Sequence, residues 1–214
     1  KYRCQIQIMR SLQSHVAKNA AKVITPSKYL AATAEYWGVP ENKISVIYNN
    51  VAIPAVVPSR REKILLFSFG RDVPWKGFSF LREIMPEIRK KFPDANLVAR
   101  EVSREERDDL LAKCSIFLLN TGYEGFSHQI LEAMSLGLPI ITTPAGGNKE
   151  IVEDRKNALV VEYNNKEAWV RAISELLKNP QLQETIAKGA KETAQKFLNR
   201  DMVGETLKVL ESII

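Results

Sequence analysis

Two glutamates, Glu124 and Glu132, flank a glycine-containing turn in the segment 123–137, which reads Y-E-G-F-S-H-Q-I-L-E-A-M-S-L-G. A buried strand is expected just before this segment, and a helix is expected to begin within it. A helix N-terminus binds anions such as phosphate, because its backbone N–H groups and the positive end of its dipole point outward. Carboxylates only accept hydrogen bonds, which suits the paired hydroxyl groups of a sugar or a ribose. The segment therefore indicates a site for a phosphate-bearing ligand with hydroxyl groups.

Three residues between the glutamates add to this site. Gly125 lets a ligand approach the backbone closely, Phe126 follows it, and Ser127 can cap the helix or donate from its hydroxyl group. Two glutamates at this spacing in an arbitrary sequence are usually solvated acids on one helix. Their interpretation as a site therefore depends on the surrounding residues.

A second segment whose residues could take part in chemistry is 67–77, F-S-F-G-R-D-V-P-W-K-G. It also includes the end of an expected buried strand. Arg71 and Lys76 would stand at the carboxyl edge of the sheet, where two cations can neutralise a diphosphate. Gly70 and Gly77 allow the loop a tight path. An arginine and a lysine at this spacing are, taken alone, ordinary surface charges.

The elements that must position these segments follow a βαβ pattern, in which short β-branched runs alternate with longer amphipathic stretches. The predicted fold class is α/β, with a Rossmann-like parallel sheet and helices on both faces. Strands are expected at 22–25, 44–47, 64–68, 96–98, 116–119, 140–142 and 158–161. Helices are expected at 5–19, 28–37, 78–90, 104–113, 127–136, 166–178, 180–197 and 202–212.

Several of the expected helix ends are readable from single residues. Ser27 is an expected N-cap, and Ser103 begins an S-x-x-E capping box with Glu106. Gly38 and Gly137 fit C-terminal stops.

The composition is that of a folded globular protein, with 45% hydrophobic and 26% charged residues in 214. Cys4 and Cys114 have neither a disulfide framework nor metal-ligand spacing, which fits a reducing cytosol. The net charge of +6 suggests an anionic partner, although the basic residues are scattered among acids. Nucleic acid is disfavoured because no run of basic residues interleaved with aromatics occurs. No apolar run approaches the length of a membrane span, so any membrane contact is expected to be peripheral.

Together the two segments resemble a known family. The two glutamates resemble the E-x7-E motif of retaining family 4 glycosyltransferases of the GT-B fold. The residues from Leu131 onward, L-E-A-M-S-L-G-L-P-I-I-T-T, are part of this resemblance. The segment 67–77 is similar to the G-R-x4-K-G element of that family. Both motifs occur in the family's order.

This resemblance implies roles for individual residues. Arg71 and Lys76 would hold the diphosphate of a nucleotide-sugar donor, with Gly70 in the same loop. Glu124, with the backbone amides of residues 125–127, would position the sugar and the β-phosphate, and Glu132 would hold the ribose hydroxyls. Glu124, Arg71 and Lys76 are the expected catalytic group. The sequence contains no Asp-x-Asp pair, so the donor is expected to react without a metal ion or another cofactor.

The resemblance also implies a domain organisation. Residues 1–50 would be the last part of an N-terminal acceptor domain, 51–61 an interdomain linker, 62–197 the donor-binding domain, and 198–214 a C-terminal helix packing back toward the N-terminal domain. The family normally has a further loop, helix and strand where Ala99 is followed directly by Arg100. We predict that residues are missing from the sequence between 99 and 100, a natural deletion being the alternative.

The expected function is transfer of a sugar from a nucleotide-diphosphate sugar to a hydroxyl of a glycan or lipid-linked acceptor, with retention of configuration. The expected location is cytoplasmic, with contact with the inner membrane surface as an option, and this chain alone is expected to be weakly active or inactive. Two alternatives stay open, a non-catalytic nucleotide-sugar-binding module and a GT-B-fold epimerase. A dinucleotide-binding Rossmann protein and a P-loop NTPase are disfavoured, because neither G-x-G-x-x-G nor G-K-[ST] occurs.

Overall fold

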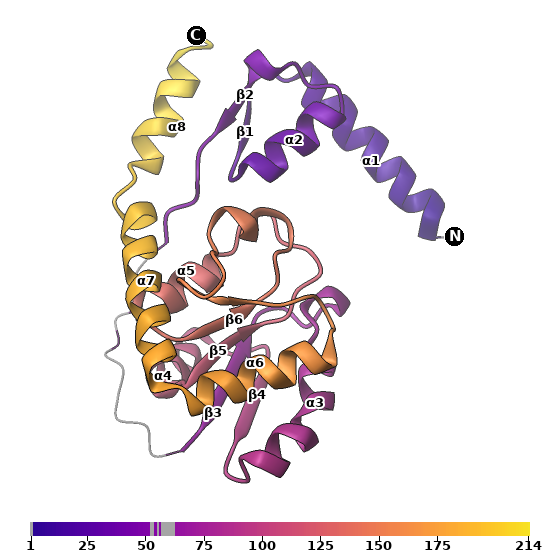
Figure 1. Cartoon of the computed structure of the whole chain (residues 1–214). Helices are drawn as coiled ribbons and strands as arrows, with labels where there is room; N and C mark the ends of the chain where they lie inside the picture. The colour runs from indigo at the N-terminus through magenta and orange to yellow at the C-terminus, as the bar shows by residue number, and fades with distance from the viewer. Residues whose placement is uncertain (1, 52–53, 55, 57–62) are drawn as a thin grey trace. The chain divides into compact units, whose positions relative to one another are not determined.

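The computed structural model describes residues 2–51, 54, 56 and 63–214 (Figure 1). Contacts divide the chain into two compact units. One consists of Lys1–Asn50 with Arg200–Ile214, and the other of Val51–Asn199. Every residue that the sequence proposes for the site belongs to the second unit.

A five-stranded parallel sheet forms the centre of this second unit, as the alternating sequence pattern predicts. The strand order is β4-β3-β5-β6-β7. The strands are β3 (Leu65–Phe69), β4 (Asn96–Arg100), β5 (Ile116–Leu119), β6 (Ile140–Thr142) and β7 (Leu159–Val160). Both β5 and β6 are buried along their whole length, which is why they read as continuous apolar runs.

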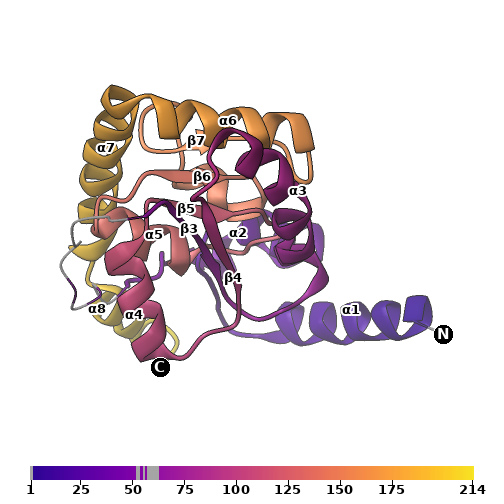
Figure 2. The same cartoon turned by 90° about the horizontal axis from the view of Figure 1, so that it is seen from below.

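Helices cover both faces of the sheet (Figure 2). On one face lie α3 (Phe78–Lys91) and α6 (Lys166–Lys178), which pack against each other. On the other face lie α4 (Arg104–Lys113), α5 (His128–Ser135) and α7 (Pro180–Leu198), and α5 packs on α7. The predicted α/β class with helices on both faces is confirmed.

Alternate residues of each strand supply the two faces of the sheet. Leu66 and Leu118 pack with Trp169 of α6 in the core beneath α3 and α6. On the opposite face, the rings of Phe69 and Phe117 lie 5.6 Å apart. The sheet is therefore fixed from both sides, which makes the loops at its carboxyl edge a stable base for a site.

The predicted caps and stops are confirmed, but the Glu106 carboxylate pairs with Arg100 and does not complete the predicted capping box. The hydroxyl of Ser27 accepts a hydrogen bond from the Leu30 amide at 3.1 Å, and Ser103 caps α4 in the same way. Gly38 and Gly137 adopt φ of 87° and 66°, in the left-handed region that favours glycine after a helix.

The first unit combines a two-stranded parallel sheet with three helices. Its strands β1 (Val23–Thr25) and β2 (Ile44–Val46) pair with Val23 opposite Ile44. The helices of this unit are α1 (Tyr2–Asn19), α2 (Lys28–Tyr36) and α8 (Met202–Glu211). The two chain segments meet where Asn50 donates to the Arg200 carbonyl at 3.3 Å, and where the Arg200 guanidinium lies 5.0 Å from the Tyr48 ring centroid.

The domain boundaries inferred from the sequence stay predictions. The expected linker at 51–61 lies largely outside the described residues. The structure joins Ala99 to Arg100 within β4, and Glu101 and Val102 then lead to the N-cap of α4. A short connection is thus sterically sufficient between these elements. That residues are missing from the sequence between 99 and 100 stays a prediction.

Candidate active site

Three loops meet at the carboxyl edge of the sheet, because they leave the neighbouring parallel strands β3, β5 and β6. The loop after β3 accepts a hydrogen bond at the Trp75 carbonyl from the Gly122 amide, at 2.8 Å. The loop after β6 is held by the Gly147 amide, which donates to the Glu124 carbonyl at 2.9 Å. The two predicted segments and the glycine-rich loop after β6 therefore form one continuous surface.

Lys76 is the centre of the contacts on this surface. Its ammonium group donates to the carboxylate of Glu124, 48 residues further along the chain, and to Oε1 of Gln129 at 2.9 Å. The Lys76 and Glu124 side chains are only 13% and 14% exposed. Two residues predicted to act together are thus an ion pair that is partly shielded from water, and such shielding strengthens the interaction of each with an incoming charge.

Gln129 is a member of the site that the sequence analysis missed. Its Nε2 donates to the Phe69 carbonyl at the end of β3, at 2.5 Å, while its Oε1 accepts from Lys76. The side chain therefore ties the lysine to the last residue of β3. An uncharged glutamine between two acids carries little sequence signal, and only its place in the first turn of α5 could have suggested it.

Glu132 points to a different neighbour from Glu124. One oxygen of its carboxylate accepts from Arg107 of α4 at 3.3 Å, and Arg107 also pairs with Asp108 at 2.7 Å. The other carboxylate oxygen is buried and has no hydrogen-bond partner. This oxygen is an acceptor whose capacity the protein itself does not use, and such atoms are rare in folded proteins.

Burial shifts the pKa of two side chains on α5. It raises the pKa of Glu132 above its ordinary value, and the positive charge of Arg107 partly offsets this effect. It lowers the pKa of His128, and the negative charge of Glu124 acts in the opposite direction.

Three other residues predicted for the site differ in exposure and in their contacts. Arg71 lies two residues beyond β3, is exposed, and forms no ion pair with any described residue. Gly70 has a φ of 132°, and a side chain there would meet Nε2 of Gln129 at 2.6 Å. Ser127 caps α5 by accepting from the Ile130 amide at 3.3 Å.

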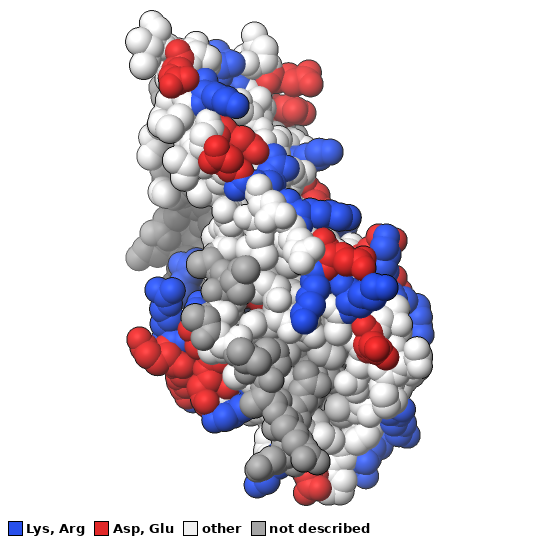
Figure 3. All heavy atoms as spheres, turned by 90° about the vertical axis from the view of Figure 1, so that its left-hand side faces the viewer, with Lys and Arg blue, Asp and Glu red and all other residues white. Residues whose placement is uncertain are grey.

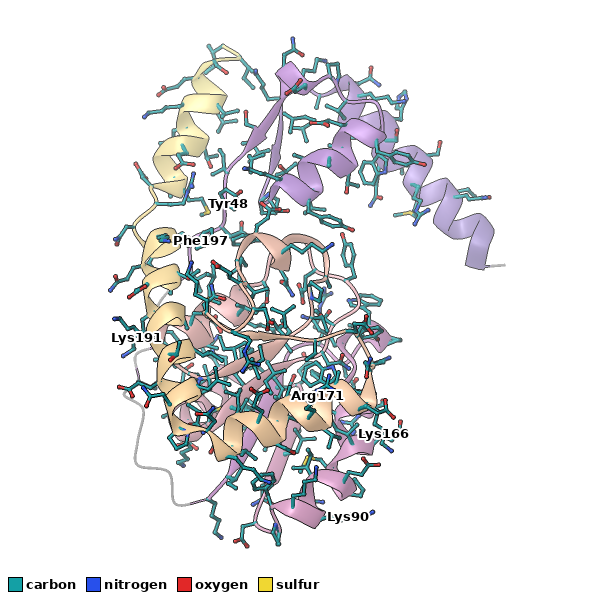
Figure 4. The ribbon with its side chains drawn as sticks, viewed as in Figure 1. Tyr48, Lys90, Lys166, Arg171, Lys191 and Phe197 are labelled. Carbon is teal, nitrogen blue, oxygen red and sulfur yellow. The ribbon has the colours of Figure 1, made fainter. Side chains whose placement is uncertain are left out.

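The side chain of Phe126 is used for packing. Its ring lies 5.4 Å from that of Phe197 on α7, which is labelled in Figure 4. Any contact of Phe126 with a ligand is therefore restricted to its backbone. Gly125 precedes it at the turn into α5 and is half-buried.

A parallel sheet with helices on both faces and a lysine-centred cluster at its carboxyl edge can be compared with known proteins. Residues 98–193 match the family model described as glycosyl transferases group 1. This part of the chain is therefore similar to group 1 glycosyl transferases, and the α/β fold of the unit matches that of solved GT-B glycosyltransferases.

Individual relatives agree with this class. The chain is 27% identical to an uncharacterized glycosyltransferase of Haemophilus influenzae over 202 residues, and 28% identical to the uncharacterized glycosyltransferase MJ1178 of Methanocaldococcus jannaschii over 220 residues. These matches cover 82% and 93% of this chain, but only 57% and 62% of the relatives. The solved structure of Anabaena Alr3699/HepE in complex with UDP-glucose has a TM-score of 0.79, with 19% identity over 97% of this chain and 67% of that one.

Proposed function

We propose that this chain is the donor-binding part of a retaining family 4 glycosyltransferase, which transfers a sugar from a nucleotide-diphosphate sugar to an acceptor hydroxyl of a glycan or lipid-linked glycan. The observation that carries the proposal is the shielded cluster of Lys76, Glu124 and Gln129 at the carboxyl edge of the sheet. A parallel α/β sheet binds ligands at this edge.

The bond that breaks in this reaction joins the anomeric carbon to the β-phosphate oxygen, so negative charge develops on the leaving diphosphate. Lys76 would offset that charge, and its fixed position means that little reorganisation is needed as the charge develops. Arg71 would contribute a second positive charge from the exposed end of the same loop. An entering diphosphate has to compete with the Glu124 carboxylate for Lys76, which would leave Glu124 available to a sugar hydroxyl.

Glu132 would hold the ribose. Its unpartnered carboxylate oxygen can accept from a ribose hydroxyl, provided that a small side-chain movement exposes it. The positive charge of Arg107 favours the ionised carboxylate and partly offsets the opposite effect of burial. Glu124 and Glu132 would therefore differ in role because they have different cationic partners.

Reaction without a metal ion remains part of the proposal. Lys76 and Arg71 supply the positive charge that a divalent cation supplies elsewhere. The test is to measure transfer by the whole protein with excess EDTA. Activity that disappears with EDTA and returns with Mg²⁺ or Mn²⁺ would refute this part.

The proposed activity concerns the whole protein, since the chain spans about three fifths of the relatives that it matches. We propose that this chain alone binds a donor weakly and transfers little. A non-catalytic nucleotide-sugar-binding module would bind the donor without turnover, and an epimerase would convert a free nucleotide sugar without an acceptor.

A thermal-shift panel of nucleoside diphosphates and nucleotide sugars would test donor binding, because a ligand that binds only the folded state raises the melting temperature. We expect at least one nucleoside diphosphate to stabilise the whole protein, whereas adenosine and inorganic phosphate do not. Product analysis with the stabilising nucleotide sugar then separates the three functions. Stabilisation by none of the panel would contradict the proposal.

A further inference from the structure

Three aromatic side chains are exposed close to the lysine of the site. Trp75 is 44% exposed, Tyr123 is 50% exposed and Tyr163 is 39% exposed. Aromatic side chains bury large apolar surfaces, so exposed ones that gather in one place indicate a binding surface more often than single exposed residues do. Trp75 and Tyr123 directly precede Lys76 and Glu124 in the chain.

The three residues come from separate loops that are bound to one another. Besides the bond between the Gly122 amide and the Trp75 carbonyl, the Tyr163 hydroxyl donates to the Pro74 carbonyl at 3.3 Å. Gly122 lies against the Tyr163 ring, where an added side-chain carbon would be 3.2 Å from the ring. The loops that carry the three exposed residues are therefore joined directly to one another.

The backbone beside Tyr163 is also held in place. Asn164 has a φ of 56°, and its amide donates to Oδ1 of Asn120 at 3.2 Å. Nδ2 of Asn120 in turn donates to Oδ1 of Asn164 at 2.7 Å. A left-handed asparagine costs conformational energy, and this reciprocal pair of hydrogen bonds stabilises the backbone next to Tyr163 in that conformation.

Two of the three aromatic residues, Trp75 and Tyr163, come from loops that lead to the other face of the sheet from the proposed ribose residue, whereas Tyr123 precedes α5. Trp75 leads into α3 and Tyr163 leads into α6, the two helices on one face of the sheet. Glu132 and Arg107 belong to α5 and α4, on the other face (Figure 2). A donor whose ribose contacts Glu132 and whose diphosphate contacts Lys76 would direct its sugar away from the ribose end, toward the rim of the site that carries these aromatic residues.

The chemistry of the rim fits a carbohydrate. A pyranose ring presents a face of C–H groups, which packs on an aromatic ring, while its hydroxyl groups bond to polar groups at the edge. Tryptophan and tyrosine provide both properties, a flat apolar face and a polar tip. A nucleobase could also stack on these rings. It would then lie on the same side as the sugar, which conflicts with a ribose held at Glu132.

We propose that Trp75, Tyr123 and Tyr163 form a carbohydrate-binding rim that takes a sugar ring of the acceptor glycan. This inference rests on the proposed function, since it assumes that the donor occupies the adjacent cluster of Lys76 and Glu124. The rim places the acceptor beside the anomeric carbon of the donor, and it makes the acceptor a glycan instead of a simple alcohol or a lipid headgroup without sugar.

The test measures donor and carbohydrate binding separately on the whole protein. Nucleotide binding is first measured by titration with UDP, or with whichever nucleoside diphosphate stabilises the protein most. With that nucleotide saturating, saturation-transfer NMR and tryptophan fluorescence then follow binding of soluble tetrasaccharides of β-linked glucose, α-linked glucose, β-linked N-acetylglucosamine and α-linked mannose. The chain has two further tryptophans, Trp37 and Trp169, so only quenching that disappears in the Trp75→Phe variant is assigned to Trp75.

We expect at least one tetrasaccharide to bind, and Trp75→Ala and Tyr163→Ala each to weaken it about fivefold or more, as the loss of an aromatic contact does. Trp75→Phe should retain most of the affinity. Tyr36→Ala is the matched control, because Tyr36 is 89% exposed and belongs to the other unit. Nucleotide affinity and the melting temperature should change little in all four variants.

Several outcomes would overturn the inference. Binding of no tetrasaccharide at millimolar concentration, or binding that neither alanine variant weakens, would show that the rim does not take a glycan. A loss of nucleotide affinity in Trp75→Ala, with tetrasaccharide binding unchanged, would show a base-stacking role. Failure of every nucleotide to bind would instead refute the proposed function and the inference built on it.

Discussion

Apart from Arg71, each charged residue proposed for the site has an oppositely charged partner. Lys76 bonds to Glu124 and Gln129, while Glu132 bonds to Arg107. A partly shielded pair keeps both charges in place, but a ligand has to replace one partner as it binds. The effects of single substitutions therefore depend on the partner that is left behind.

Lys76→Ala should lower the turnover of the whole enzyme about 100-fold or more, because it removes a fixed positive charge where the leaving diphosphate develops negative charge. Steady-state kinetics with the cognate nucleotide sugar would check this. Lys90→Ala is the matched control, since Lys90 is an exposed lysine of α3 (Figure 4). Unchanged turnover in Lys76→Ala would remove the lysine from the mechanism.

Gln129→Leu should lower turnover about tenfold with little change in the donor KM, because Lys76 keeps its charge but loses a hydrogen bond that holds its position. Gln129→Glu keeps an acceptor for Lys76, but it cannot donate to the Phe69 carbonyl and it adds a negative charge beside the proposed diphosphate site, so it should lose at least as much turnover. Unchanged turnover in Gln129→Leu would contradict the role given to Gln129, whereas a loss that follows a lowered melting temperature would indicate an effect on stability. A melting curve for each variant separates that case.

Glu132→Gln should weaken nucleotide binding about tenfold, since a charged acceptor is replaced by a neutral one. The same substitution should stabilise the folded protein at neutral pH relative to the parent. The folded pKa of Glu132 is raised, so the parent loses stability as the pH rises through the window above the ordinary value of 4.5, and the variant does not. Melting temperatures should therefore favour the variant more at pH 7 than at pH 4. A variant that is less favoured at pH 7 would contradict the raised pKa.

At the scale of elements, the site depends on tight turns that end strands and begin helices. Gly77 has a φ of 60° between the 3-10 turn Pro74–Lys76 and α3. A side chain there would lie 2.7 Å from the Asn120 carbonyl oxygen, which belongs to the loop after β5. The glycine thus allows the two loops to approach closely enough for Lys76 to reach Glu124.

Gly77→Ala should cost about 1–2 kcal/mol of stability for its left-handed backbone and should also weaken nucleotide binding. Gly137→Ala is the control, because Gly137 has a φ of 66° but faces only the flexible side chain of Lys191 (Figure 4). Denaturant unfolding should show a loss in both variants, larger in Gly77→Ala because its methyl group meets a backbone oxygen, while nucleotide affinity should fall only in Gly77→Ala. An equal affinity in the two variants would contradict the role given to this approach.

At the scale of the whole molecule, the net charge of +6 is the difference between 31 basic and 25 acidic residues. On the face that Figure 3 shows, basic and acidic side chains are interspersed. Within the part of the chain that the structure describes, no helix is long and apolar enough to cross a membrane. Contact with anionic lipid at the membrane surface, which the sequence suggested, stays a prediction.

Vesicle sedimentation would check this contact. We propose that the whole protein binds vesicles containing phosphatidylglycerol more strongly than vesicles of phosphatidylcholine alone, and that raised salt weakens the binding, as expected for electrostatic attraction. Equal binding to both kinds of vesicle, or binding to neither, would refute it.

The sequence by itself determined the elements and predicted where a site would lie relative to them. Helix caps such as Ser103 act locally, and buried parallel strands require continuous apolar runs, so both are readable without tertiary contacts. The segments 67–77 and 123–137 were located because each follows such a strand.

Only the tertiary structure decided which side chains meet. Lys76 pairs with Glu124 and bonds to Gln129, whereas Glu132 pairs with Arg107. These contacts depend on how the ends of separate strands and helices pack, which no local pattern encodes.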